Sequence, residues 1–377
     1  MVLLIFLLIL SILVLIHEFG HFITAKKLGV KVDEFGLGLP PRVFGKRIGE
    51  TLYSLNLLPF GGFVKLEGEE LTDTTNIEQE IKNPKSFVSK TPLQRSAIIT
   101  AGVIMNYALA VILFYIVLMS NGFKTFYIPL LFDYKFRFGQ VTQLGTVVTA
   151  MEDNSPAVTA GIQLGDALLK IDGAVVNDVT DVRKELTGKI GKEVSVEVMD
   201  VKSATNTKTR TVKAIPTLSE AGYPVLGVYL TEAVSIGYIS GTQKLFAGFL
   251  HSYNIMSYSV NGFKEIIQLS FRTRDISPVA STVTGPVGIY QVVGGVLKYG
   301  GDKVLVNLLD FVALMSVSLA FINIMPFPAL DGGRLVFVVI EGITKKRVNP
   351  NVEAKVHYIG MAFLLLLMLL VTVKDII

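Results

Sequence analysis

The sequence predicts a polytopic α-helical membrane protein with four transmembrane helices, a membrane-associated β-hairpin and one extracytoplasmic α+β domain. Three observations predict this fold class. Apolar residues make up 51% of the 377 positions and charged residues 18%, whereas a soluble domain carries about 25% charged residues. The apolar residues gather in four long stretches. A polar segment of short strand and turn patterns separates the second stretch from the third.

Each apolar stretch approaches or meets the length of about 20 residues that a helix needs to cross a bilayer. The first, residues 1–16, lacks the basic start and the small-residue cleavage site of a signal peptide, so we interpret it as a retained helix. It continues in residues 22–25 beyond an interruption by two histidines and a glutamate. The other three stretches are residues 97–118, 311–330 and 358–373.

Basic residues orient these helices. Lys and Arg are concentrated within residues 26–47, after the first stretch, and within residues 345–347, after the third. Under the positive-inside rule both loops are cytoplasmic, which places both termini and residues 121–303 on the extracytoplasmic side. The net charge of +4 includes no long basic run, so the sequence offers no nucleic-acid site.

These patterns divide the chain into four predicted parts. They are an N-terminal membrane part at 1–120, an α+β domain at 140–232, an amphipathic linker on the membrane surface at 233–303 and a C-terminal membrane part at 304–377. Within the linker, residues 243–269 have the pattern of an amphipathic helix that lies on the membrane.

The polar interruption of the first stretch has the pattern of a metal site. His17 and His21 are four residues apart, so on a helix both imidazoles face one way and can share a zinc ion. Glu18 is placed to take a proton from water. The chain has no Cys, so any metal must be held by His and carboxylates. A chance match is the alternative, but three ionisable groups at membrane depth cost at least about 2.5–3.5 kcal/mol each, and a metal offsets that cost.

A third ligand is expected from the cytoplasmic end of the third stretch, where Asp331 lies at the same membrane depth. The segment from Asn323 to Arg334 contains two Pro and two Gly, and a broken helix is tolerated in a membrane only where the freed backbone is buried in protein or lines a cavity. The alternative is that Asp331 only caps the following helix. We leave out His251, predicted at the opposite membrane interface, and His357, because a fourth protein ligand would close the site.

These motifs resemble one known family. His17-Glu18-x-x-His21, combined with the N-x-x-P-x-P-x-L-D-G sequence that begins at Asn323 and contains Asp331, is similar to the site-2 protease family of intramembrane zinc metalloproteases, in its bacterial RseP/RasP branch. The resemblance covers nearly the whole chain. It implies His17, His21 and Asp331 as zinc ligands, Glu18 as general base and acid, and Asn323 as a residue that holds the substrate or stabilises the oxyanion.

The resemblance also implies a setting and a substrate class. It implies a multi-pass protein of the bacterial cytoplasmic membrane, with an active site near the cytoplasmic side and single-pass membrane proteins, such as anti-sigma factors or remnant signal peptides, as substrates. In the second apolar stretch, residues 101–106 are similar to the family's A-G-P-x-x-N segment, with Val103 in place of Pro. For Asn106, an interhelical hydrogen bond and a substrate role both stay open.

A β-hairpin is predicted at residues 50–68. Residues 51–67 have the pattern of two strands around a turn at Gly61-Gly62, and they are apolar enough to enter the membrane. An edge strand would hold a substrate in extended form through main-chain hydrogen bonds. The re-entrant hairpin of the family falls in this region. The alternative is a cytoplasmic hairpin that lies on the bilayer surface.

The string S-P-A-x-x-A-G-I-x-x-G-D-x-L-L-x-I-D-G, which runs from Ser155 to Gly173, is similar to PDZ domains of bacterial proteases. It implies one PDZ domain at 140–232. Such domains bind a peptide C-terminus beside an edge strand, expected here near residues 226–230. Peptide binding and a size filter over the active site both stay open.

The sequence thus predicts a zinc-dependent endopeptidase that cuts transmembrane segments, with the lipid bilayer as a further partner. One alternative is a catalytically silent membrane PDZ scaffold, against which the intact Glu18, His17, His21 and Asp331 argue. Another is a transporter with an ion site at the midplane, but the sequence lacks the internal repeat expected of that class.

Overall fold

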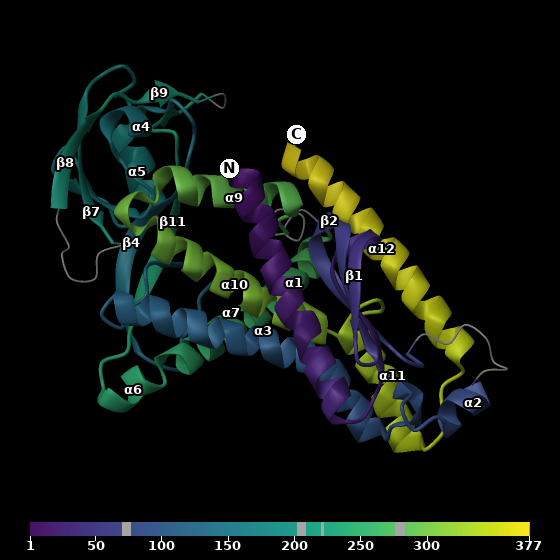
Figure 1. Ribbon diagram of the computed structural model, residues 1–377. Coiled ribbons are helices and arrows are strands. Elements are labelled where there is room, and N and C mark those ends of the chain that lie inside the picture. Colours follow the sequence, from purple (N-terminus) through teal and green to yellow (C-terminus); the bar gives the residue numbers. More distant parts are fainter. Residues whose placement is uncertain (70–76, 202–208, 220–221, 276–282, 377) are drawn as a thin grey trace. The chain divides into compact units, whose positions relative to one another are not determined.

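The computed structural model describes residues 1–69, 77–201, 209–219, 222–275 and 283–376 (Figure 1). The chain forms two compact units, which are described separately. Unit 1 comprises Met1–Ile112, Ile266–Leu297 and Asp310–Ile377, and unit 2 comprises Leu113–Glu265 and Lys298–Leu309. The predicted parts at 140–232 and 233–303 each include a few residues outside the described segments.

Four helices in the described part of the chain are long and apolar enough to cross a membrane, as the sequence predicted. They are α1 (Val2–Lys27), α3 (Pro92–Ser120), α10 (Val304–Ile324) and α12 (Pro350–Ile376). The predicted bounds of the third stretch, 311–330, are wrong. α10 ends at Ile324, and a separate helix, α11 (Asp331–Thr344), begins after a loop. Pro326 and Pro328 cannot supply the backbone N–H that a continuous helix requires, which explains the break.

Helices α1 and α3 cross at very short distance within unit 1. A Cβ atom on Gly20 of α1 would lie 2.4 Å from the backbone oxygen of Ala101 in α3. Small residues allow such close approach, and they are the usual basis of helix packing where lipid removes the hydrophobic driving force. The crossing fixes the face of α1 that carries the two histidines.

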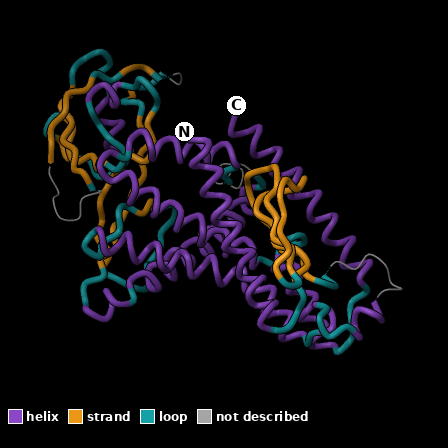
Figure 2. The backbone as a smooth tube through the Cα atoms, viewed as in Figure 1, coloured by secondary structure: helices purple, strands orange, loops and turns teal. Residues whose placement is uncertain are grey.

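A separate β-sheet is formed by β1 (Val32–Ile48) and β2 (Thr51–Leu66) (Figure 2). β2 reverses near Gly61, which has a φ of 76°, so the two predicted arms around Gly61-Gly62 are present. They do not pair with each other, because Leu37 of β1 pairs with both Leu55 and Gly62. The predicted hairpin at 50–68 therefore omitted β1, the strand that joins its arms.

The order of pairing places the second arm of β2 at an edge of this sheet. Residues 34–37 pair with residues 62–65 on one side and with 52–55 on the other, and residues 42–48 pair with 51–56. The arm that ends at Leu66 thus has one row of backbone groups that β1 does not use. The remaining elements of this part of the chain are α2 (Ile77–Lys82), the 3-10 helix η2 (Phe87–Ser89) and α9 (Pro286–Tyr299).

Unit 2 is built on a seven-stranded sheet. Its strand order is β3-β11-β4-β5-β7-β8, and β6 pairs with β5. The strands are β3 (Ile128–Pro129), β4 (Gln140–Met151), β5 (Asp166–Ile171), β6 (Ala174–Val175), β7 (Val194–Asp200), β8 (Thr209–Ala214) and β11 (Val228–Gly237), with β9 (Thr217–Leu218) and β10 (Pro224–Val225) forming a second, two-stranded sheet. The helices are α4 (Pro156–Ala160), α5 (Val179–Leu186), α6 (Gly241–Leu245), α7 (Ala247–Thr273) and the 3-10 helix η3 (Gly301–Lys303).

Cap and turn residues in the sequence predict a short helix that begins at Ser155, a second helix over 178–186, and strands at 145–150, 167–171, 194–199 and 211–215. The Ser155 side chain accepts a hydrogen bond from the Val158 N–H and caps α4, and Asp178 caps α5 in the same way. A core of fully buried side chains such as Val196 and Ile171 lies between the helices and the sheet. The strands and two helices expected from turn and cap residues are therefore confirmed.

Helices α6 and α7 cover the predicted amphipathic helix at 243–269. The prediction for His251 is wrong, because this residue is buried within unit 2 rather than placed at an interface. Its Nδ1 lies 3.2 Å from the Tyr238 hydroxyl, and its ring packs edge to face against Phe114. Burial lowers the pKa of His251 to about 3, so this side chain is neutral.

Candidate metal centre

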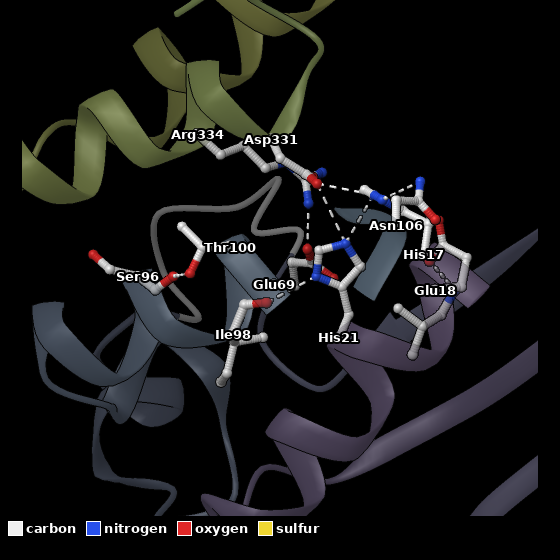
Figure 3. Close-up of polar contacts among 11 residues, drawn as sticks. His17, Glu18, His21, Glu69, Ser96, Ile98, Thr100, Asn106, Asp331 and Arg334 are labelled. Carbon is white, nitrogen blue, oxygen red and sulfur yellow. Dashed lines mark hydrogen bonds and ion pairs between the residues drawn. The ribbon is translucent and has the colours of Figure 1, made fainter. Parts of the chain in front are cut away.

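Three side chains from the two ends of the sequence meet in unit 1. The Nε2 atoms of His17 and His21, on one face of α1, lie 3.1 Å apart. The Oδ2 atom of Asp331, at the start of α11, lies 2.9 Å from the first and 3.3 Å from the second (Figure 3). Both histidines are buried. The structure therefore brings together the three residues that the sequence selected as ligands.

The spacing of these atoms fits a tetrahedral metal. Zinc bonds of about 2.0–2.1 Å separate neighbouring ligand atoms in a tetrahedral site by about 3.3 Å. Asp331 Oδ2 is buried and accepts no hydrogen bond of regular geometry, although two imidazole nitrogens lie beside it. Three atoms with available lone pairs at this spacing are the donor set that a zinc ion requires.

The far nitrogen of His21 is fixed by backbone. Its Nδ1 lies 2.8 Å from the carbonyl oxygen of Ile98 in α3. A carbonyl only accepts, so Nδ1 carries the proton and Nε2 presents its lone pair toward His17 and Asp331. A hydrogen bond of this kind sets the tautomer and the ring orientation of a metal-binding histidine.

Asn106 contacts the Nδ1 atom of His17, as the Ile98 carbonyl contacts the Nδ1 atom of His21. Its Nδ2 atom is 3.5 Å from His17 Nδ1, and its Oδ1 atom is buried with no partner in the described part of the chain. A turn of the amide brings Oδ1 to the N–H of His17. The interhelical hydrogen bond, left open by the sequence, is thus the role that these contacts favour. Asn106 is held in turn by Ser316 of α10, whose hydroxyl donates to the Asn106 carbonyl at 2.7 Å.

A glycine leaves the space that the two imidazoles fill. A Cβ atom on Gly102 would lie 2.4 Å from His21 Nε2 and 2.8 Å from His17 Nε2. Any side chain at this position of α3 would enter the place where the ring nitrogens converge. The motif around Asn106 drew attention to this segment, but only the packing of α3 on α1 shows why residue 102 has no side chain.

Glu18 is connected to the β1–β2 sheet. Its Oε2 atom accepts a hydrogen bond from the backbone N–H of Val64, in the edge arm of β2, at 3.1 Å. Glu18 follows His17 directly in α1 and lies beside it in the cluster (Figure 3), and its carboxylate is at the same time hydrogen-bonded to the sheet edge. This position suits a group that exchanges protons with a reactant held between them.

The start of α11 is packed against the loop that precedes it. A Cβ atom on Gly332 would lie 2.2 Å from the Met325 carbonyl oxygen, and one on Gly333 would lie 2.3 Å from that of Phe327. Arg334 forms an ion pair with Glu69. The two glycines thus allow the close turn that brings Asp331 to the histidines, whereas the sequence indicated only that they interrupt the helix.

Two further residues considered from the sequence make no hydrogen bond or ion pair to the three candidate ligands in the described part of the chain. Asn323 is in the last turn of α10. His357, in α12, is placed with its Nδ1 atom 2.9 Å from the N–H of Ala329. The assignment of Asn323 to the substrate or oxyanion stays a prediction.

An H-E-x-x-H helix that meets a distant aspartate among apolar helices defines a metal-dependent membrane peptidase. The chain belongs to the family described as Peptidase family M50, whose pattern matches residues 5–367. The family predicted from the motifs is thereby confirmed, as is the prediction of an enzyme of the metalloprotease class.

Relatives span the whole chain. A protein of Clostridium perfringens, named a putative zinc metalloprotease, is 36% identical over 97% of this chain and 96% of its own length. The zinc metalloprotease RasP of Bacillus licheniformis is 29% identical over 98% of this chain and 97% of its own. These names agree with zinc as the predicted cofactor. The crystal structure of a PDZ domain from a Listeria monocytogenes SdrC-like protein matches 24% of this chain and 92% of its own, with 22% identity and a TM-score of 0.21.

Proposed function

We propose that this member of peptidase family M50 is a zinc-dependent endopeptidase that hydrolyses peptide bonds within transmembrane segments of membrane proteins. The observation that carries the proposal is the convergence of His17, His21 and Asp331 to within 3.3 Å, on helices apolar enough to span a bilayer. A hydrolytic site that opens among such helices acts on a bond at membrane depth.

The residues divide the chemistry between them. His17, His21 and Asp331 would hold the zinc, which supplies Lewis acidity that lowers the pKa of water to about 7 and polarises a carbonyl. Ile98 and Asn106 hold the two rings in the orientation that this requires. Glu18 takes the proton from the attacking water at a carboxylate oxygen and returns it to the leaving amine. Asn323 is retained as the residue for the substrate or the oxyanion.

The edge arm of β2 supports a mode of substrate binding. A peptide bond in a helix is shielded, so the enzyme must hold the substrate extended, and an unpaired strand edge does this through main-chain hydrogen bonds. The backbone N–H of Val64, in this edge, donates a hydrogen bond to Glu18. Large apolar side chains of the sheet, including Val43, Phe44 and Leu57, are exposed, which supports a sheet that enters the bilayer over one that lies on its surface.

We assign residues 140–232, which lie within unit 2, the role of an extracytoplasmic PDZ domain. A groove of about 750 Å³ lies along α5 and the start of β11, with Val182, Leu186, Leu226 and Tyr229 among its lining residues. The expected edge strand at 226–230 borders this groove, which supports capture of a peptide C-terminus. Restriction of bulky substrates by the domain as a size filter is the other form of the same proposal.

The setting follows from charge. Lys26 and Lys27 end α1 at the side of the candidate site, and the positive-inside rule then makes this side cytoplasmic. We propose a bacterial cytoplasmic membrane protein whose substrates are single-pass proteins, such as anti-sigma factors or remnant signal peptides. Leu245 of α6, Phe249 of α7 and Phe246 between the two helices are exposed, which supports contact of this linker with lipid.

The test removes the base and keeps the metal. Glu18→Gln preserves the shape of the side chain and its acceptor for the Val64 N–H but cannot take a proton. The purified full-length variant in detergent should bind one zinc per chain and cut a transmembrane peptide at less than about 1% of the wild-type rate, since general acid–base catalysis contributes about 10²–10⁴-fold. Membrane-peptide proteomics of cells with either form would then name the substrates.

Two outcomes would contradict the proposal. Full cleavage by Glu18→Gln would remove the mechanism. Absence of stoichiometric zinc from the wild-type protein would favour the alternative, a catalytically silent membrane scaffold.

A further inference from the structure

The loop that carries Asp331 holds an unfavourable backbone conformation. Residues 325–330 connect α10 to α11, and Ala329, two residues before Asp331, has a φ of 75°. This left-handed region is disfavoured for any residue with a Cβ atom, and it persists only where the surroundings hold it. Something outside the loop must therefore stabilise this conformation.

Helix α12 supplies the stabilising contacts. The backbone N–H of Ala329 donates to Nδ1 of His357 at 2.9 Å. One turn further along α12, Gly360 lies so close to the loop that a Cβ atom there would be 2.4 Å from Pro328 Cβ and 2.7 Å from its carbonyl oxygen. The rings of Phe327 and Phe363 lie 5.7 Å apart. One face of α12 thus holds the loop immediately before Asp331.

The property of His357 that matters for this contact is its hydrogen-bond acceptor, Nδ1. Because Nδ1 accepts from Ala329, the proton of the neutral ring is on Nε2, which is buried and has no hydrogen-bond partner among the described residues. A buried polar atom without a partner is destabilising, and an apolar side chain would avoid that cost. The acceptor matters because a backbone N–H left free at membrane depth is also costly.

We infer that His357 is a positioning residue for the metal centre: through the N–H of Ala329 it holds the loop that sets Asp331 against His17 and His21. This inference rests on the proposed function. His357 is not a ligand itself, because its Nδ1 lone pair accepts from Ala329 and its Nε2 carries the proton of the neutral ring. His357 acts on Asp331 indirectly, through the loop that contains Ala329. Loss of a residue that orients a metal ligand typically weakens metal binding 10–100-fold.

The test separates the acceptor from the ring. His357→Phe keeps an aromatic side chain beside Phe337, 5.7 Å away, but removes the acceptor. His357→Asn removes the ring but can place Oδ1 near the position of Nδ1. Zinc dissociation constants of the full-length proteins in detergent are measured by competition with a chelator. We expect zinc binding about 10–100-fold weaker for the Phe variant and within about threefold of wild type for the Asn variant, with matching changes in kcat.

Two results would overturn the inference. Wild-type zinc affinity in the Phe variant would show that the contact is merely structural, and equal weakening in both variants would show that the acceptor is not what matters. Should the Phe variant fail to fold, Gly360→Ala displaces the same loop while His357 remains, and unchanged zinc affinity in that variant would overturn the inference as well. A wild-type protein without zinc would instead refute the proposed function.

Discussion

Glycine serves different purposes in the two units. In unit 2, Gly161 and Gly173 have φ values of 79° and 84° at the ends of a helix and a strand, and a Cβ atom on either would meet nothing within 4 Å. In unit 1, Gly20 and Gly102 have ordinary helical backbones, but a Cβ atom on either would lie 2.4 Å from a neighbouring atom. Gly161 and Gly173 allow a backbone conformation with positive φ, whereas Gly20 and Gly102 leave room for neighbouring atoms to approach the helix closely.

The difference follows from what stabilises each unit. Unit 2 has a core of buried aliphatic side chains between helices and a sheet, so burial of apolar surface supplies the driving force and turns only close the chain. Helices α1 and α3 are mostly apolar, and close backbone packing replaces that driving force in lipid. The candidate metal centre also depends on a glycine, because the two histidine rings between the helices occupy the space that a side chain at residue 102 would fill.

The largest expected effect comes from filling this space. Gly102→Ala places a Cβ atom where the ring nitrogens of His17 and His21 converge, so at least one imidazole must leave its position. We expect zinc affinity to fall by more than about 100-fold, as for loss of a ligand-orienting contact or worse, and cleavage to be lost. The measurement is zinc content by atomic emission together with chelator competition.

Gly295→Ala is the matched control for this change. Gly295 also lies in a helix, α9, but a Cβ atom there would meet nothing within 4 Å. This variant should bind zinc as the wild type does. Equal zinc content in both variants would show that the space at residue 102 is not needed.

A smaller loss of zinc affinity is expected from removing the hydrogen-bond partner of His17. Asn106→Ala leaves the His17 ring free to turn but keeps it in place by packing, so we expect zinc binding about tenfold weaker, with protein yield and helicity unchanged. Ser316→Ala is the control, because Ser316 donates to the Asn106 backbone at 2.7 Å and makes no hydrogen bond to His17 in the described structure. Comparable zinc loss in the two variants would assign the effect to packing of α10 on α3 instead.

The comparison also explains what the sequence could predict. His17, His21 and Glu18 were predictable because ligand spacing on one helix is a local pattern and because polar groups among apolar residues are costly. Asp331 needed a second argument, from membrane depth. Helices and strands at 140–232 followed from caps and turns such as Ser155. These signals act within a few residues along the chain.

The contributions that were missed all act between distant segments. The Ile98 carbonyl is a backbone group that any residue would supply, so its role toward His21 leaves no trace in composition. The two Pro and two Gly of the segment from Asn323 to Arg334 predicted a break in the helix, but hydropathy alone extended the third stretch to residue 330 and did not show that α10 ends at Ile324. His251 was misplaced because a helical pattern does not show which face another element covers. Only the packing of the folded chain reveals these roles.

The smallest effect should come from the glycines of unit 2. Gly161→Ala introduces a Cβ atom at a φ of 79° without any clash, so the cost is the left-handed strain alone, about 1–2 kcal/mol. Gly241→Ala in α6, where a Cβ atom also meets nothing within 4 Å, should be neutral or slightly stabilising because Ala favours a helix. The midpoint of thermal unfolding in detergent measures both, and zinc binding should stay at the wild-type value in each. A loss of zinc affinity in Gly161→Ala would contradict the separation of roles, since it would mean that strain in the sheet domain reaches the metal centre.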